Sequence, residues 1–165
     1  MDPATWSPRG PRAQGNARDR NVAEVPAQPE RFDYHGALVV IETGEDQIVL
    51  IHPKGATPAA PASLPSDPCE LGETPREAAV RISREKTGLD VVVEREFTTF
   101  IQHGTPTGTM CAHGYVARAV GGSLLLEGPE GPAIEYSLDA LPRIVPVRVA
   151  NQRALAAYLA YRARR

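Results

Sequence analysis

The charged residues best suited to chemistry lie close together in one segment of this chain. Between residues 70 and 85 the acids are Glu70, Glu73, Glu77 and Glu85. Glu77, Arg81 and Glu85 recur every four residues, so these three side chains share one face if the segment is helical. Clustered carboxylates can bind a hard divalent ion such as Mg²⁺, which prefers oxygen ligands. The same spacing also suits a ladder of surface salt bridges. A metal site and an ion-pair ladder are therefore both open from the residues alone.

The helix that would carry these side chains has a start signal and a stop signal. Thr74 is a suitable N-cap, Pro75 fits the first helical position, and Glu77 completes a capping-box pattern. Gly88 is placed to end the helix in the left-handed conformation. The sequence therefore predicts a helix over about residues 75–87.

The rest of the chain predicts a sheet around this helix. Runs rich in β-branched residues, separated by glycine- and proline-containing turns, predict strands. The predicted strands are 36–42, 47–52, 91–103, 109–120, a short one at 123–126, and 133–137, with loop over 53–68 and a short turn at 139–141. A second helix is expected over 151–163, with Leu155 and Leu159 in its apolar stripe. This order fits an α/β fold, an α/β/α sandwich with a mixed central sheet.

The segment from Leu64 to Leu89 resembles a Nudix box, which is typical of hydrolases of nucleoside diphosphates linked to another moiety. The pattern is G-x5-E-x7-R-E-U-x-E-E-x-G-U, where U is a bulky aliphatic residue. The matching residues are Glu73, Arg81, Glu85, Gly88 and Leu89, supported by the flanking Leu64-Pro65 and Glu70-x-Gly72-Glu73. The resemblance covers roughly residues 34–163. It implies a Nudix-like sandwich, Mg²⁺ or Mn²⁺ as cofactor if the protein is active, and an Arg81 that orients a box glutamate.

The box departs from the family pattern at several positions. Asp67 stands where the first glycine belongs, Ser83 replaces the aliphatic residue, and Ile82 and Lys86 replace two glutamates. On a helix, positions 82, 85 and 86 fall within about 100° of one another, so they would converge on a metal. They carry no net charge here, against three negative charges in a full box. Two charges about 4 Å apart interact by about 4 kcal/mol at an effective dielectric near 20, so the box is expected to bind metal poorly and is interpreted as degenerate.

Other acids are candidates to replace the lost ligands. Glu70, Glu73 and Glu85 are the candidate metal ligands, and Glu73, Glu85 and Glu130 are the candidate catalytic residues. Glu130 and Glu135 lie in a run that resembles a segment of some Nudix hydrolases in which a loop glutamate serves as base. The alternative is that both are surface acids in a Gly/Pro-rich loop.

Three basic side chains are candidates for ligand binding: Lys86, Arg81 and Lys54. An ammonium at position 86 can neutralise a phosphate or carboxylate without a metal. Equally, a lysine near the C-terminus of a helix interacts favourably with the helix dipole and needs no ligand.

Composition excludes several classes of function. The chain has 165 residues and a formal net charge of -2, which favours neither nucleic-acid nor membrane binding. The arginine-rich stretch after Leu141 reads as a solvated helix face and tail. Two cysteines, Cys69 and Cys111, make no disulfide framework and predict reduced thiols in a cytoplasmic protein. No apolar run reaches the ~18 to 20 residues of a membrane span, and the N-terminus has no signal-peptide core. The frequent use of arginine, alanine and proline indicates a GC-rich bacterial genome.

The chain divides into an arm and one domain. Residues 1–31 lack hydrophobic periodicity and predict a disordered or partner-docking arm, with Trp6 as a possible anchor, whereas 32–165 form the Nudix-like domain. None of the histidines has metal-ligand spacing, although His103 and His113 flank a strand turn and could pair across it. A homodimer is implied only by the resemblance.

Two interpretations of function follow, with a third held open. The preferred one is a divergent Nudix-fold protein that binds a nucleotide- or diphosphate-like ligand, with weak or absent hydrolysis. The competing one is a metal-dependent hydrolase of nucleoside diphosphate derivatives with a site rearranged around Glu70, Glu73, Glu85 and Glu130. The third is a biosynthetic enzyme that uses the same fold for other chemistry.

Overall fold

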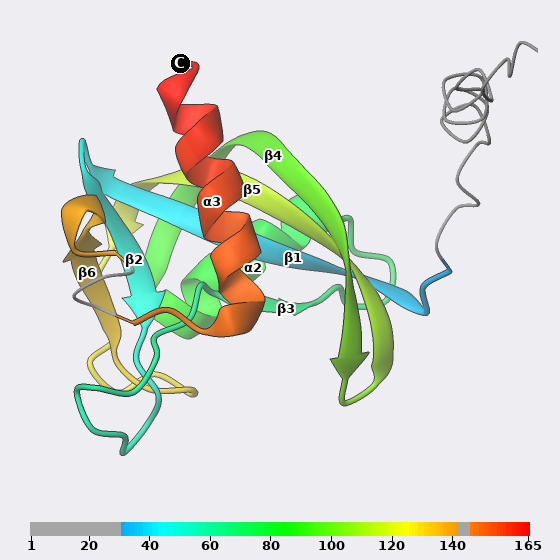
Figure 1. The fold of residues 1–165 in the computed structure, drawn as a ribbon, viewed down its shortest axis with the longest axis horizontal. Helices are drawn as coiled ribbons and strands as arrows, with labels where there is room; N and C mark the ends of the chain where they lie inside the picture. The colour runs from blue at the N-terminus through cyan, green and yellow to red at the C-terminus, as the bar shows by residue number, and fades with distance from the viewer. Residues whose placement is uncertain (1–30, 142–145) are drawn as a thin grey trace, which may run out of the picture. The chain divides into compact units, whose positions relative to one another are not determined.

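The structure of this protein is a computed structural model that describes residues 31–141 and 146–165 (Figure 1). The predicted arm, apart from Arg31, lies outside the described residues, so the boundary of the domain stays a prediction. The strands are β1 (Tyr34–Gly44), β2 (Gln47–Ile51), β3 (Ser66–Pro68), β4 (Leu89–Thr105), β5 (Gly108–Gly122) and β6 (Ala133–Ser137). The helices are α2 (Pro75–Thr87), the short 3-10 helix η1 (Leu138–Ala140) and α3 (Val149–Ala163).

The strands form one mixed sheet in the order β4-β5-β1-β2-β6, with β3 also pairing with β1. Strands β1 and β5 are parallel, and the other pairs are antiparallel. Strand β1 is therefore central, because β5 lies along one edge and β2 and β3 share the other. The tip of the long β4–β5 hairpin extends away from both helices (Figure 1).

The two faces of the sheet are covered by different helices. Val40 of β1 belongs to a core cluster with Leu155 and Tyr158 of α3, whereas Val39 belongs to a second cluster with Ile82 of α2. Successive strand residues point to opposite faces, so one apolar strand supplies both cores. Figure 1 shows α3 crossing one face while α2 lies behind the sheet. The predicted α/β/α sandwich with a mixed sheet is confirmed.

The ends of α2 follow their local sequence. The Thr74 side chain accepts a hydrogen bond from the backbone N–H of Glu77 at 3.1 Å, and Pro75 starts the helix. Gly88 has φ 81°, and its N–H donates to the carbonyl of Arg84. The N-cap and the glycine stop are therefore as predicted.

Two predictions of secondary structure were wrong. Residues 123–126 form no strand; instead, the backbone N–H groups of Ser123 and Leu125 donate to the carbonyls of Gly88 and Thr87 at the end of α2. The segment 53–68 is not only loop, because its last residues form β3 against β1. In both cases the hydrogen-bond partner lies in another element.

The apolar stripe of α3 also differs from the expectation. Leu155 is buried as predicted, but Leu159 is 39% exposed and Tyr158 is fully buried in its place. Within residues 31–141 and 146–165, no helix is both long and apolar enough to cross a membrane.

Candidate functional site

Arg81 of α2 is the central cation of a network of ion pairs. Its Nε and Nη2 atoms donate to the two carboxylate oxygens of Glu73 at 2.8 and 2.9 Å, and its Nη1 atom donates to Glu85 at 3.1 Å. The hydrogen bond from Arg81 lowers the pKa of the Glu73 carboxyl, and the Glu73 carboxylate raises the pKa of Arg81. The ion-pair ladder expected from spacing is thus present between Arg81 and Glu85, and Glu73 is a stronger partner.

The loop before α2 holds Glu73 in this position. The backbone N–H of Glu70 donates to Glu73 Oε1 at 3.1 Å, and the N–H of Glu73 donates back to the carbonyl of Glu70 at 3.0 Å. The Glu70 carboxylate itself lies 3.6 Å from Arg81 Nε. Glu70, Glu73 and Glu85 therefore surround one guanidinium.

Lys86 is the second cation of the site. It is only 8% exposed, its ammonium donates to the Glu130 carboxylate, and it lies 3.7 Å from Asp67 Oδ1. The other oxygen of Asp67 lies 3.4 Å from Arg81 Nη1. Asp67 and Lys86, two departures from the box pattern, thus meet in space, and Asp67 links both cations.

Glu130 reaches the site because its loop is fixed to the end of β2. The N–H of Lys54 donates to the carbonyl of Glu130, and the N–H of His52 donates to the carbonyl of Pro132, both at 3.0 Å. Gly131 has φ 132°, and a Cβ there would lie 1.9 Å from the carbonyl oxygen of His52. Only glycine fits this close approach.

The assembled site is acidic. Five carboxylates, those of Asp67, Glu70, Glu73, Glu85 and Glu130, surround the cations Arg81 and Lys86. Five negative and two positive formal charges leave -3. Helix positions 82, 85 and 86 alone carry no net formal charge. The tertiary structure adds carboxylates to them from β3 and from the loop that holds Glu130.

A cleft of about 350 Å³ opens beside Lys86. Asp67, Lys86 and Glu130 form its charged end. The remainder is lined by neutral side chains that include Tyr34, Gln102, Thr105 and Met110. A mixture of apolar and hydrogen-bonding groups beside a few charged side chains is typical of small-molecule clefts.

In the observed arrangement, the carboxylates of the predicted metal ligands Glu70, Glu73 and Glu85 are engaged with the Arg81 guanidinium. Both oxygens of Glu73 accept hydrogen bonds from Arg81, Glu85 accepts another, and the Glu130 carboxylate is bound to an ammonium. Among residues 31–141 and 146–165, Glu73, Glu85 and Glu130 do not form a group of three converging ligand atoms that could hold a metal ion. Mg²⁺ requires a near-octahedral oxygen shell, which these occupied carboxylates do not present.

The structure corrects the expected position of Ile82. It was placed in an arc with residues 85 and 86 that faces a metal, but it has no exposed surface and packs in the core with Ala78 and Ala79. Helical spacing correctly gave the angle between positions 82, 85 and 86. It did not show that position 82 faces the sheet. Position 82 therefore points into the protein interior.

The side chains of the remaining candidates take no part in the ion pairs of this site. Lys54 is exposed and does not line the cleft beside Lys86. Glu135 is an exposed residue of β6, paired with Val49 of β2. Asp67 was not predicted as a site residue, because it was interpreted only as a substitute for glycine.

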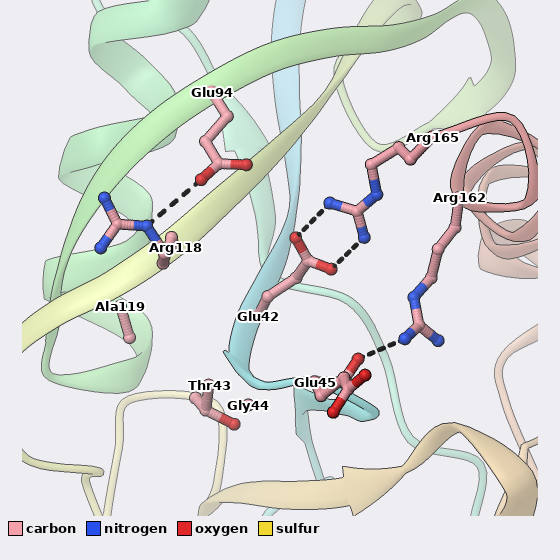
Figure 2. A pocket seen from close by; sticks show the side chains of 9 residues that line it. All are labelled: Glu42, Thr43, Gly44, Glu45, Glu94, Arg118, Ala119, Arg162 and Arg165. Atoms are coloured by element: carbon pink, nitrogen blue, oxygen red, sulfur yellow. Dashed lines mark hydrogen bonds and ion pairs between the residues drawn. The ribbon is translucent and has the colours of Figure 1, made fainter.

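A second cleft, of about 430 Å³, lies between the β1–β2 turn and the end of α3 (Figure 2). Its three arginines are paired with acids: Arg118 with Glu94 at 3.2 Å, Arg162 with Asp46 at 2.5 Å, and Arg165 with Glu42 at 2.7 Å. Figure 2 shows the Arg165 guanidinium facing both oxygens of Glu42. Arg162 and Arg165 fasten α3 to the β1–β2 turn and to β1, and Arg118 joins β5 to β4. Because all three arginines are already paired, the cleft is a weaker candidate for anion binding.

A mixed sheet between two helices, with a glutamate-rich loop and helix at its edge, defines the Nudix fold class. The chain matches the NUDIX domain over residues 34–158 and therefore belongs to that family. Members of the family typically use a divalent metal and act on phosphate-containing substrates. Among curated proteins, no sequence matches the chain.

Solved structures share this fold at low sequence identity. A NUDIX hydrolase from Nitrosomonas europaea is 18% identical with a TM-score of 0.63, covering 78% of this chain and 89% of that one. A MutT NUDIX hydrolase from Burkholderia pseudomallei is 24% identical with a TM-score of 0.58, covering 75% and 96%. An ADP-ribose pyrophosphatase from Streptococcus suis is 22% identical with a TM-score of 0.52, covering 77% and 91%. These similarities establish the fold.

Proposed function

We propose that this protein has a degenerate Nudix box and binds a nucleotide- or diphosphate-like ligand, with weak or absent hydrolysis. The observation that carries the proposal is the buried ammonium of Lys86 between Asp67 and Glu130. An ammonium supplies fixed positive charge and can donate hydrogen bonds to phosphate oxygens. Unlike a metal ion, it cannot coordinate a water molecule and lower its pKa. It therefore favours binding of an anion over activation of water.

The ligand anion must exchange with a carboxylate that is already bound. The side chain of Glu130 is 51% exposed, whereas that of Lys86 is 9% exposed. Removing the partner of a buried cation leaves that charge uncompensated, which is costly, so Glu130 would leave Lys86 only when a ligand anion takes its place. A phosphate would then replace Glu130 on Lys86, while the sugar or base occupies the neutral part of the cleft.

One pair of measurements tests this proposal directly. Turnover of dinucleoside polyphosphates, nucleotide sugars and ADP-ribose is measured with Mg²⁺ or Mn²⁺, and binding of the same compounds is measured by calorimetry. We expect binding of at least one compound without turnover at ordinary enzyme rates. Metal-dependent turnover that is lost in Glu73→Gln or Glu85→Gln would contradict the proposal.

Glu130→Gln separates the proposal from its main competitor. If Glu130 competes with the ligand for Lys86, its neutralisation should raise ligand affinity several-fold. Lys86→Gln should lower affinity by at least tenfold, since it removes the anion's partner. If Glu130 is instead a catalytic base, Glu130→Gln should abolish turnover and leave affinity without this gain.

The second candidate is a metal-dependent hydrolase with a rearranged site. The formal charge of -3 around Arg81 and Lys86 favours it, because such a field attracts divalent cations. Glu70, Glu73 and Glu85 would hold Mg²⁺ or Mn²⁺ only after Arg81 releases them. The turnover measurement above decides between the two functions.

A further inference from the structure

A separate cluster of metal-ligating side chains lies on the sheet, outside the acidic site. His35, Cys111 and His113 each offer a ligand atom, and these atoms lie within 4.8 Å of one another. Among the residues that the structure describes, it is the one such group of three. Cys111 is buried, His113 is partly buried and His35 is exposed, so an ion could enter from the His35 side.

Strand pairing brings the three residues together. Strands β1 and β5 are parallel neighbours, with His35 opposite Cys111 and Ala37 opposite His113. Residues 111 and 113 are two apart on one strand, so their side chains point to the same face. The backbone thus fixes the cluster, and no loop needs to rearrange.

The distances are close to those of a tetrahedral site. His35 Nδ1 lies 2.9 Å from His113 Nε2, and Cys111 Sγ lies 3.7 Å from the same nitrogen. Zinc bonds of about 2.0–2.1 Å to nitrogen and 2.3 Å to sulfur imply ligand separations of about 3.3 and 3.6 Å. The exposed His35 ring would have to move away from His113 by about 0.4 Å, and it would also have to approach Cys111 Sγ, since the three ligand atoms now lie within 4.8 Å of one another.

Glu96 on β4 contacts His113 on the side of the ring that faces away from the cluster. Its Oε1 lies 3.0 Å from His113 Nδ1, the ring nitrogen that faces away from the cluster. When that nitrogen is protonated and donates to the carboxylate, Nε2 has its lone pair directed at His35 and Cys111. Metal-bound histidines almost always have such a partner, which fixes the ring and raises its basicity.

We propose that His35, Cys111 and His113 bind a divalent transition metal of the zinc class. Imidazole and thiolate ligands suit Zn²⁺ and Co²⁺, whereas Mg²⁺ and Mn²⁺ prefer the oxygens of the acidic site. Binding converts the Cys111 thiol to a thiolate and releases one proton to solvent. Three ligands leave a fourth position for water, and the proposal does not depend on the function proposed above.

Titration of the full chain with Co²⁺ in place of Zn²⁺ tests the site. We expect one ion per chain, with the charge-transfer absorption of a cobalt–thiolate bond, and displacement of Co²⁺ by Zn²⁺. Cys111→Ser should remove this absorption, while Cys69→Ser, which changes the other free cysteine, should retain it. Saturating Mg²⁺ should leave the absorption unchanged.

The histidines and Glu96 provide further variants. His35→Ala should lower Co²⁺ affinity at least tenfold and, because the side chain is exposed, should fold normally; His103→Ala is its matched control. Glu96→Gln should lower affinity about 10- to 100-fold without removing the thiolate absorption. Absence of thiolate absorption in the wild type, its loss in Cys69→Ser, or unchanged affinity in His35→Ala would each overturn the proposal.

Discussion

At the scale of single residues, the site is defined by the carboxylates that pair with its two cations, Arg81 and Lys86. Arg81 is held by Glu73 through both of its carboxylate oxygens. Lys86 is held by Glu130 and Asp67, so its charge is directed into the cleft only when Glu130 is displaced. The preference for binding over hydrolysis in our proposal depends on this one ammonium.

Reversing the charge at position 86 should create a divalent-ion site. In Lys86→Glu, three carboxylates would lie together where an ammonium now separates them, and their repulsion would be relieved by a metal. We expect Mn²⁺ affinity at least tenfold above wild type by calorimetry. Lys86→Gln, which removes the cation without adding a ligand, should gain less, and no gain in Lys86→Glu would contradict the assigned position of Lys86.

Position 82 should not accept a charge. Ile82 is fully buried between α2 and the sheet, so Ile82→Glu would place a carboxylate without a partner in the core. We expect a loss of about 3–5 kcal/mol in the free energy of unfolding at neutral pH, measured with urea. Ile82→Val, which only removes a methyl group, should cost about 0.5–1.5 kcal/mol. A similar cost for both variants would show that position 82 reaches solvent.

At the scale of elements, the end of α2 meets the start of β4 and the segment that follows β5. Gly88 stops the helix with φ 81°, and the segment after β5 packs directly against it. A Cβ at Gly88 would lie 2.1 Å from the carbonyl oxygen of Ser123 and 2.9 Å from the Leu125 side chain. The glycine is therefore required for its conformation and also for space.

Gly72 provides a matched control for this double requirement. It has φ 79°, but a Cβ there would meet nothing within 4 Å. Gly72→Ala should cost about 1–2 kcal/mol from left-handed backbone alone, and Gly88→Ala should cost clearly more because backbone atoms must also shift. Urea denaturation of the two variants measures the difference; equal costs would remove the packing argument.

At the scale of the whole molecule, carboxylates with lowered pKa connect distant parts of the chain. Burial alone would raise the pKa of Glu42, but hydrogen bonds from Arg165 and Tyr158 lower it below the ordinary value of 4.5. The Tyr158 hydroxyl donates to Glu42 at 2.7 Å, so this carboxylate joins α3 to β1. Glu73 joins the box loop to α2 in the same way, through Arg81.

These contacts predict loss of stability in acid. A carboxylate with a folded-state pKa below its unfolded value stabilises the fold fully above about pH 4.5, and that stability is lost as the pH falls through the folded pKa. We expect the urea midpoint to fall between about pH 5 and pH 3, and to fall less steeply in Glu42→Gln, whose starting stability is lower. Glu135→Gln, at an exposed position of β6, is the control, and an unchanged slope in Glu42→Gln would refute the assignment.

The sequence alone determined the features that depend on neighbours along the chain. The Thr74 cap, the Gly88 stop, the β1–β2 turn and β6 were predictable because their signals lie within a few residues of one another. The family was predictable for the same reason, since five residues match the Nudix pattern at fixed spacing.

The tertiary structure decided which side chains meet. Lys86 and Glu130 are 44 residues apart, and His35 and His113 are 78 apart. The pairing of His103 with His113, which the sequence left open beside an ordinary core or surface position, does not form, because the β4–β5 register places Thr99 opposite His113. The burial of Ile82 was equally hidden, because helical spacing gives relative angles but not the direction of the sheet. Contacts between distant segments depend on strand order and register, and here these decide both the charge of the acidic site and the metal-ligating cluster.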